Sequence, residues 1–175
     1  MIQKIKRKDM TKEGIITDLL DVTKYAESEE ICIRNSMIET LTLDFASFDY
    51  PVIIENSVIG TIGFDHTWFN QGLSLKNCII KEKVVYDSGE CHQMTTISNN
   101  VFMEALVFWN CVFYADLNIQ ENIFCKGTSL LDGSNYFETI CKCRHNIGVM
   151  DMRSELTEEL GTANTVGTIG LVEIE

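Results

Sequence analysis

The apolar residues of this chain form short stretches that return in the same order from about residue 31 to residue 150. A polar marker follows the first stretch of each period, and in four periods it is an asparagine: Asn35, Asn56, Asn77 and Asn99. The markers are 21, 21 and 22 residues apart. Regular self-similarity at this spacing is typical of a solenoid, because a single coil cannot bury its apolar face alone.

Each period contains apolar stretches short enough to be the strands of one coil. The first stretch covers Ile31–Ile33, Val52–Ile54, Leu73–Leu75, Thr95–Ile97, Leu117–Ile119 and Thr139–Cys141. The second covers Met37–Ile38, Val58–Ile59, Ile79–Ile80, Val101–Phe102 and Ile123–Phe124, and the third Leu41–Leu43, Ile62–Phe64, Val84–Tyr86, Leu106–Phe108 and Leu130–Leu131. A strand rises about 3.3 Å per residue, so one period accommodates three or four strands with sharp corners. The sequence therefore predicts an all-β fold, a single-stranded right-handed parallel β-helix (β-solenoid) of about five to six coils.

The repeated residues have predicted structural roles. The four marker asparagines are expected at one corner, because asparagine tolerates left-handed backbone angles and its amide can bond to the amides of neighbouring coils. Large apolar residues that recur are expected in the core, among them Phe102, Phe113 and Phe124. Residues 87–92 replace a phenylalanine-bearing segment and are predicted to bulge as a loop.

The two ends of the solenoid are predicted to be capped. Residues 1–30 are interpreted as a basic tail followed by a short helix, because apolar residues between Thr11 and Tyr25 fall at helical spacing. The solenoid occupies residues 31–150. Residues 151–175 are expected to form a cap or tail, with a helix over Ser154–Leu160 and a strand over Leu171–Ile174. Such caps would protect the open edges of the solenoid from pairing with other chains.

Large apolar residues follow one another every five or six positions at Phe102, Phe108, Phe113, Ile119, Phe124 and Leu130, and Ala115-Asp116-Leu117 forms one Ala-Asp-Leu unit. This pattern resembles the pentapeptide-repeat family in its loose, Phe-rich form, best over Asn77–Leu131. The coils are 21–22 residues long rather than the family's 20, so a more general right-handed parallel β-helix stays open. The resemblance implies a non-catalytic protein, because most members of the family are non-catalytic. Some acidic family members resemble duplex DNA and bind topoisomerases.

Composition narrows the classes of partner. The net charge is −12, from 26 acidic and 14 basic residues, which argues against a nucleic-acid or anionic-membrane surface and favours either solubility or a basic partner. No signal peptide or transmembrane segment is recognised, so the chain is expected in the cytoplasm with its seven cysteines reduced. No cofactor or metal is predicted.

Two carboxylates are weak catalytic candidates. Asp44 and Asp65 fall at equivalent places in adjacent periods, and His66 follows Asp65. Paired carboxylates can share a proton or bind a cation. The next copies in this alignment are Tyr86 and Phe108, so exposed corner residues are the favoured interpretation.

Cysteine and histidine occur together at two other places. Cys141, Cys143 and His145 alternate and could point to one face, but a fourth zinc ligand is missing, so buried thiols are favoured. Cys91 and His92 would form a nucleophile only if the pKa of the thiol were lowered. An ordinary loop is the favoured interpretation there.

Aromatic residues supply weak binding candidates. Tyr50, Gln71, His92, Tyr114 and Tyr136 align in one predicted column, with Trp68 and Trp109 on nearby turns. Such a row can bind a sugar or a partner protein, although stacking that protects the core explains it as well.

The function expected from the sequence is that of a non-catalytic β-solenoid that binds another macromolecule. The partner would be a protein or a second copy of the chain, joined through an end or a face. Two alternatives stay open: a DNA-mimicking inhibitor of a DNA-binding protein, and a carbohydrate-active β-helix enzyme. The first predicts acidic residues along one side and a dimer that extends the rod. The second needs export or a sugar substrate inside the cell, and the missing signal peptide counts against it.

Overall fold

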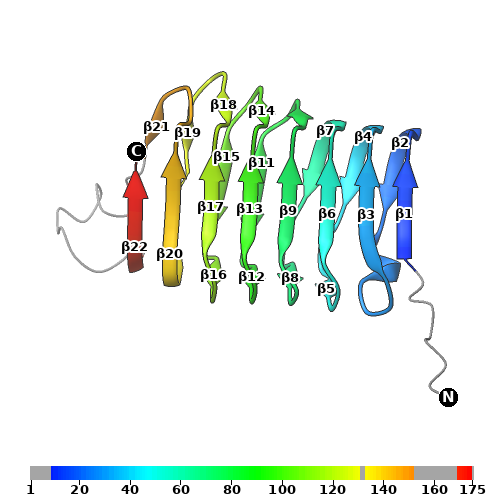
Figure 1. The fold of residues 1–175 in the computed structure, drawn as a ribbon, viewed down its shortest axis with the longest axis horizontal. Helices are drawn as coiled ribbons and strands as arrows, with labels where there is room; N and C mark the ends of the chain where they lie inside the picture. Colours follow the sequence, from blue (N-terminus) through cyan, green and yellow to red (C-terminus); the bar gives the residue numbers. More distant parts are fainter. Residues whose placement is uncertain (1–8, 131–132, 152–168, 175) are drawn as a thin grey trace, which may run out of the picture.

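The computed structural model describes residues 9–130, 133–151 and 169–174 (Figure 1). In these residues the chain forms a parallel β-solenoid of about six turns, with coils of about 22 residues. Strand β1 (Asp9–Glu13) lies at one end of the rod and β22 (Ile169–Ile174) at the other. The predicted β-solenoid is confirmed.

Each coil runs over four sides, which we call A to D. Side A contains β1, β3 (Glu30–Arg34), β6 (Val52–Glu55), β9 (Leu73–Lys76), β13 (Thr95–Ser98), β17 (Leu117–Gln120), β20 (Tyr136–Arg144) and β22. Side B contains the first parts of β2 (Ile16–Asp21), β4 (Met37–Thr42) and β7 (Val58–Gly63), followed by β10 (Ile79–Ile80), β14 (Val101–Phe102) and β18 (Ile123–Phe124).

The remaining strands complete the coil. Side C is formed by the second parts of β2, β4 and β7, then β11 (Val84–Asp87), β15 (Leu106–Trp109), β19 (Thr128–Ser129) and β21 (Met150–Asp151). Side D contains β5 (Ser47–Phe48), β8 (Trp68–Phe69), β12 (Glu90–Cys91), β16 (Val112–Phe113) and the start of β20. All pairings between strands are parallel, so equivalent residues of successive coils form columns.

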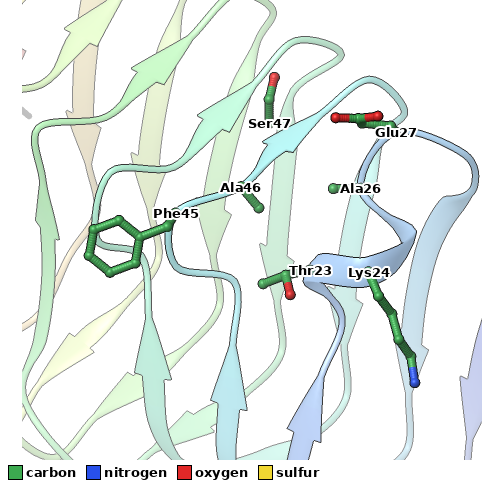
Figure 2. Close-up of a pocket in the computed structure, with 7 residues that line it drawn as sticks. All are labelled: Thr23, Lys24, Ala26, Glu27, Phe45, Ala46 and Ser47. Carbon is green, nitrogen blue, oxygen red and sulfur yellow. The ribbon is translucent and has the colours of Figure 1, made fainter.

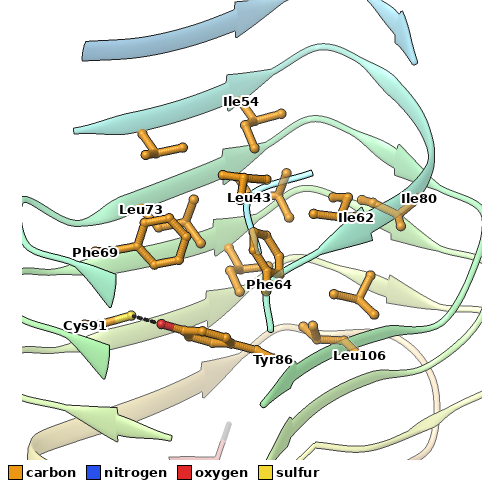
Figure 3. Packing of buried hydrophobic residues seen from close by; sticks show 14 of the residues in the cluster. Leu43, Ile54, Ile62, Phe64, Phe69, Leu73, Ile80, Tyr86, Cys91 and Leu106 are labelled. Atoms are coloured by element: carbon orange, nitrogen blue, oxygen red, sulfur yellow. Dashed lines mark hydrogen bonds between the residues drawn. The ribbon is translucent and has the colours of Figure 1, made fainter. Parts of the chain in front are cut away.

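Apolar columns from all four sides meet in one continuous core. Phe102, Phe113 and Phe124 lie in it, as predicted for them. Aromatic rings stack from coil to coil, with centroids 5.5 Å apart for Phe48 and Phe69 and 5.1 Å apart for Phe113 and Phe137. Figure 3 shows how side chains from different coils fill the space between the sheets.

The helix predicted between Thr11 and Tyr25 is wrong. Strands β1 and β2 form a further coil there, paired with β3 and β4, and only the 3-10 turn Thr23–Tyr25 is helical. The helical spacing arose because Ile15 and Leu20 face the core while the adjacent Ile16 and Leu19 are exposed on the outside. The solenoid therefore begins before residue 31.

The loop predicted at residues 87–92 is also absent. Strand β12 pairs with β8 and β16 in this segment, and the buried Cys91 takes the column position of Phe69 and Phe113. The neighbouring Tyr86 ring fills the space that the small thiol leaves, and its hydroxyl donates to the Thr67 carbonyl oxygen at 2.8 Å. The coil keeps its shape because two residues together replace one phenylalanine.

Two corners of the coil use left-handed backbone angles. Asn35, Asn56, Asn77 and Asn99 have φ of 51°, 51°, 53° and 56°, at the corner between sides A and B, which we call the asparagine corner. Phe45, His66, Ser88 and Asn110 have φ of 55°, 49°, 52° and 55°, at the corner between sides C and D, which we call the Phe45 corner. Asparagine relieves the steric cost of these angles better than any other residue except glycine.

The bonds between amide side chains lie one residue beyond the marker asparagines. Asn100 donates from its side chain to Oδ1 of Asn122 at 3.0 Å, and Asn122 donates to Oδ1 of Asn146 at 3.0 Å. Each of these side chains also accepts a backbone N–H from the preceding coil or donates to a carbonyl oxygen. The marker positions therefore set the backbone turn, and the next residue satisfies the buried polar groups.

The structure tests only part of what was predicted for the two ends of the chain. The expected helix Ser154–Leu160 lies outside the described residues, as do residues 1–8 of the basic tail, whereas Asp9 and Met10 belong to strand β1. The predicted strand Leu171–Ile174 is part of β22, which pairs with β20. Among the described residues, no helix has the length and apolar character needed to span a membrane.

Candidate binding surface at the Phe45 corner

The Phe45 corner is a ladder of backbone groups from which side chains project outward. The Phe45 amide donates to the Asp65 carbonyl oxygen at 2.7 Å, and the His66 amide donates to that of Asp87 at 2.9 Å. Because each coil repeats this bond, the side chains after each aspartate stand in one column. The backbone therefore fixes their spacing.

Phe45 is the most unusual residue of this column. The residue is 72% exposed, and its φ of 55° is a left-handed angle that bulky residues rarely adopt. The ring stacks on His66 of the next coil, with centroids 5.3 Å apart and planes 17° apart. Phe45 and His66 thus form a paired aromatic surface outside the core.

Carboxylates line the same corner. Asp44, Asp65 and Asp87 precede Phe45, His66 and Ser88, so the column continues over three coils. The alignment that placed Tyr86 and Phe108 next in this column is wrong. Tyr86 lies in the core beside Phe64, with ring centroids 5.7 Å apart, and the added residue of this coil moves Asp87 into register.

The weak catalytic pair is occupied by local bonds. Asp44 accepts the Asp65 backbone N–H at 2.7 Å, and its carboxylate fills the space beside Gly63, where a Cβ would come within 2.1 Å of it. Asp65 Oδ1 lies 4.0 Å from His66 Nδ1. In the residues that the structure describes, no group of three or more histidine, cysteine or acidic side chains is placed to hold a metal ion.

Hollows lie on both sides of Phe45. One, of about 410 Å³, lies between the 3-10 turn and the corner, with Thr23, Lys24, Glu27 and Ser47 among its lining residues (Figure 2). The other, of about 400 Å³, is lined by residues of side C and of the Phe45 corner that include Asp65, Lys83, Val85 and Asp87. Phe45 lines both hollows and stands between them as a ridge.

The predicted aromatic column is wrong as a set. Only His92 and Tyr114 stack, with centroids 4.7 Å apart and planes 20° apart. The side D pairing gives His92 the partner Asn70 on one side and Tyr114 on the other, whereas Tyr50 and Gln71 belong to the next column. Tyr136 pairs with Val112, two positions before the equivalent of Tyr114.

The two tryptophans lie on different sides of the coil. Trp68 pairs with Ser47 and Glu90 on side D, and Trp109 pairs with Asp87 at the end of side C. The Trp109 ring covers Gly133, where a Cβ would come within 2.9 Å of it. The coils contain different numbers of residues between corners, so a fixed sequence spacing did not place these aromatic residues together.

The predicted cluster of Cys141, Cys143 and His145 does not converge on one face. Both thiols are buried, with Sγ atoms 3.8 Å apart, but His145 is exposed at φ 53°, just after β20 ends. The hydrogen bond between the two thiols raises the pKa of Cys141 and lowers that of Cys143. The pair forms a buried thiol contact in the core.

Cys91 and His92 also point in different directions. Cys91 is fully buried, and this burial raises the pKa of its thiol to about 11, so the thiol is protonated at neutral pH. His92 lies at the surface, where its Nε2 is 3.1 Å from Glu90 Oε2. A nucleophilic cysteine requires a lowered thiol pKa, so the raised pKa of Cys91 contradicts this role.

Sequence reasoning missed Phe45 and Asp87. Phe45 precedes a core position and looks like part of an apolar stretch, and only its alignment with His66 reveals the corner. Asp87 was hidden because the extra residue falls between Asn77 and Ser88. Counting back from each asparagine marker would have found it, since 11 residues separate Phe45 from Asn56, His66 from Asn77 and Ser88 from Asn99.

Comparison with known proteins gives no relative from which a role could be transferred. No family model, no curated protein and no solved structure matches this chain.

Proposed function

We propose that this protein is a non-catalytic binding module that holds a partner protein at the Phe45 corner. The exposure of Phe45 at a left-handed backbone angle carries the proposal. A bulky residue at this angle costs about 1–2 kcal/mol, and this ring is outside the core. Its benefit is therefore best explained by a contact with another molecule, because aromatic side chains dominate the energetics of protein interfaces.

The surroundings favour a basic side chain on the partner. Asp65 and Asp87 supply negative charge beside the Phe45 and His66 rings. An arginine or lysine can approach an aromatic face and a carboxylate at the same time. The net charge of −12 would also attract a basic partner over a longer range.

An affinity experiment with paired variants tests this function. Wild-type protein, Phe45→Asn and Tyr114→Asn are immobilised and exposed to native lysate. Phe45→Asn suits the left-handed angle and removes the ring, whereas Tyr114→Asn removes a different exposed aromatic ring. A protein retained by wild type and Tyr114→Asn but lost from Phe45→Asn, with binding weakened by salt, supports the proposal. Identical retention by all three would reject it.

The two alternatives receive less support from the geometry. A DNA mimic needs carboxylates along one side, but described carboxylates occur on several sides and some pair with cations: Glu39 with Lys81, Glu55 with Arg34, Glu104 with Lys126 and Asp116 with Lys142. A carbohydrate-active enzyme needs a free carboxylate pair, and Asp44 is engaged by the backbone. Neither alternative has an observation that favours it over a binding module.

We also propose that this chain is related to the pentapeptide-repeat family in its loose, Phe-rich form. The six large apolar residues from Phe102 to Leu130 that follow its rhythm are all buried, and Leu117 of the Ala-Asp-Leu unit is buried as well. The four-sided coil is compatible with that pattern. An alignment of related chains would test this relationship. Large apolar residues that recur every five positions at these buried sites would support it, and the lack of a five-residue period would oppose it.

A further inference from the structure

Residues 1–8 hold the densest positive charge of the chain, and we call this stretch the basic segment. It contains four of the 14 basic residues and none of the 26 acidic ones, and its basic residues are Lys4, Lys6, Arg7 and Lys8. Two isoleucines, Ile2 and Ile5, lie in the same stretch. The basic segment precedes β1 and lies outside the described residues. It combines positive charge with apolar side chains, the two properties that the Phe45 corner is proposed to bind.

The point where the basic segment joins the solenoid lies near the Phe45 corner. Asp9 pairs with Glu30, so β1 begins the first coil on side A, and the segment meets the solenoid at the corner between sides D and A. Side D of the first two coils runs from the 3-10 turn and from Phe45 to that same corner. Across it, the Asp49 amide donates to the Ala26 carbonyl oxygen at 2.9 Å. One side of the rod and two coils therefore separate the start of β1 from Phe45.

The basic segment is long enough to cover this distance. Residues 46–51 cross side D between Phe45 and β6, so this side is at most about 20 Å wide. Phe45 lies two coils, or about 10 Å, further along the rod. The separation is therefore at most about 22 Å, whereas eight extended residues span about 26 Å. The segment can reach Phe45 and the hollows beside it without any change in the solenoid.

Carboxylates outnumber ammonium groups around Phe45. The carboxylates that line the two hollows belong to Glu27, Asp44, Asp65 and Asp87. Each hollow also has one lysine, Lys24 in the first and Lys83 in the second, and the Lys24 Nζ lies over the Tyr25 ring, 5.0 Å from its centroid. A basic side chain that enters here meets a carboxylate and the stacked rings of Phe45 and His66 together. The charge of the corner is therefore complementary to that of the basic segment.

We propose that the basic segment crosses side D and occupies the Phe45 corner of its own chain, where it competes with the partner protein. This inference rests on the function proposed above, because it concerns the same surface. A tethered segment acts at an effective concentration in the millimolar range, so even weak contacts keep it bound for much of the time. A partner then has to displace it, and neutralising the basic segment should strengthen the binding of that partner.

Limited trypsin digestion of the full chain tests the contact without any partner. Trypsin cleaves after lysine and arginine, so the rate of cleavage within residues 1–8, read by mass spectrometry, reports how much of the basic segment is released. This cleavage should be slow at low salt in wild type and in Tyr114→Asn, which removes a different exposed ring. In Phe45→Asn it should be at least about threefold faster. NaCl at about 0.5 M should remove the difference, because salt screens the contact.

Three results would overturn the proposal. Equal cleavage rates in the three proteins at low salt show that the segment is not held at Phe45, and faster cleavage in both variants shows that its release is not specific to this corner. Protection that grows with protein concentration from about 1 μM to about 100 μM shows that the segment binds a second copy instead. If Phe45→Asn fails to fold, His66→Asn replaces it, because asparagine suits that left-handed angle and the second ring of the stack is removed.

Loss of this contact and loss of the proposed function are separate outcomes. The digestion contains no partner, whereas affinity capture from lysate detects the partner alone. A protein captured through Phe45, together with equal cleavage rates, would reject the inference and keep the function. Protection of the basic segment at Phe45 without any captured protein would keep the contact and reject the function.

Discussion

The two corners of the coil have similar left-handed backbone angles but carry different side chains. At the asparagine corner, φ values of 51–57° are occupied by asparagine in four coils (Asn35, Asn56, Asn77 and Asn99) and by Glu121 and His145 in the next two. At the Phe45 corner, φ values of 49–55° are occupied by Phe45, His66, Ser88 and Asn110. Where the turn alone matters, asparagine meets its requirement at little cost. The use of phenylalanine at the other corner therefore indicates a role beyond the turn.

The largest effect is expected at the asparagine corner, from Asn122→Ala. Asn122 is fully buried and accepts bonds from the backbone and side chain of Asn100, and it donates to the Ile97 carbonyl oxygen. Its loss leaves several buried groups unpaired, so the free energy of unfolding should fall by about 4 kcal/mol. Urea denaturation measures this. Asn99→Ala, exposed at the turn itself, should cost only about 1 kcal/mol, and equal losses would contradict the division of roles.

The next largest effect is expected beside the Phe45 corner, from Gly89→Ala. A Cβ there would lie 1.9 Å from Cε2 of Tyr86, so the ring must move, at a cost of about 3 kcal/mol. Thermal unfolding gives the loss. The equivalent position two coils earlier holds Ala46, opposite Leu43 in place of the tyrosine. Adding Tyr86→Leu to Gly89→Ala should therefore cost less than the sum of the single changes, and strict additivity would argue against the clash.

Exchanging the corner residues tests the comparison directly. Asn56→Phe should lower the free energy of unfolding by about 1–2 kcal/mol, because a bulky residue enters a left-handed angle. Phe45→Asn should raise it by about 1 kcal/mol, because the same strain is removed and little packing is lost. Chemical denaturation of both variants decides the signs. A destabilised Phe45→Asn would mean that the ring stabilises the fold itself.

The smallest effect concerns the first coil, where a 3-10 turn takes the place of the Phe45 corner. Hydrogen bonds from the Thr23 side chain and backbone lower the pKa of Asp21 below 3.8. The stabilisation is therefore complete above about pH 4 and is lost as the pH falls through the lowered value. Because this carboxylate is exposed, Asp21→Asn should cost about 0.3 kcal/mol at pH 6.

The pH dependence of that variant supplies its own control. The difference in urea midpoint between wild type and Asp21→Asn should shrink towards zero as the pH falls below 3.8 and through the lowered pKa of Asp21. A difference that stays constant with pH would show that the Thr23 bonds do not depend on the charge of Asp21.

The sequence predicted the solenoid because Asn35, Asn56, Asn77 and Asn99 define one corner almost without drift. It failed where coil length changes. Ten residues separate Asn35 from Phe45, but 11 separate Asn77 from Ser88, so an alignment by fixed period moved Asp87 out of its column. The extra residue falls on sides B and C, and nothing in its composition marks the place.

The outer surface limited the prediction in a second way. Apolar residues outside the solenoid, such as Ile16 and Leu19, sit next to core residues and imitate the spacing of a helix. Periodicity arguments assume that apolar residues face inward. Both Phe45 and exposed outer residues of side B such as Ile79 violate that assumption, so the surface proposed for binding is one that the sequence concealed.

The unequal halves of the coil have a consequence for protein engineering. From Phe45, His66, Ser88 and Asn110 to the next asparagine-corner residue the chain always takes 11 residues, whereas the other half takes 10 or 11. In these four coils sides D and A thus keep a constant length and sides B and C absorb an added residue without loss of register, whereas the next coil takes 12 residues in each half, from Glu121 to Gly133 and from Gly133 to His145. Short peptides grafted into that half on successive coils would be displayed in parallel rows at a spacing of about 4.8 Å.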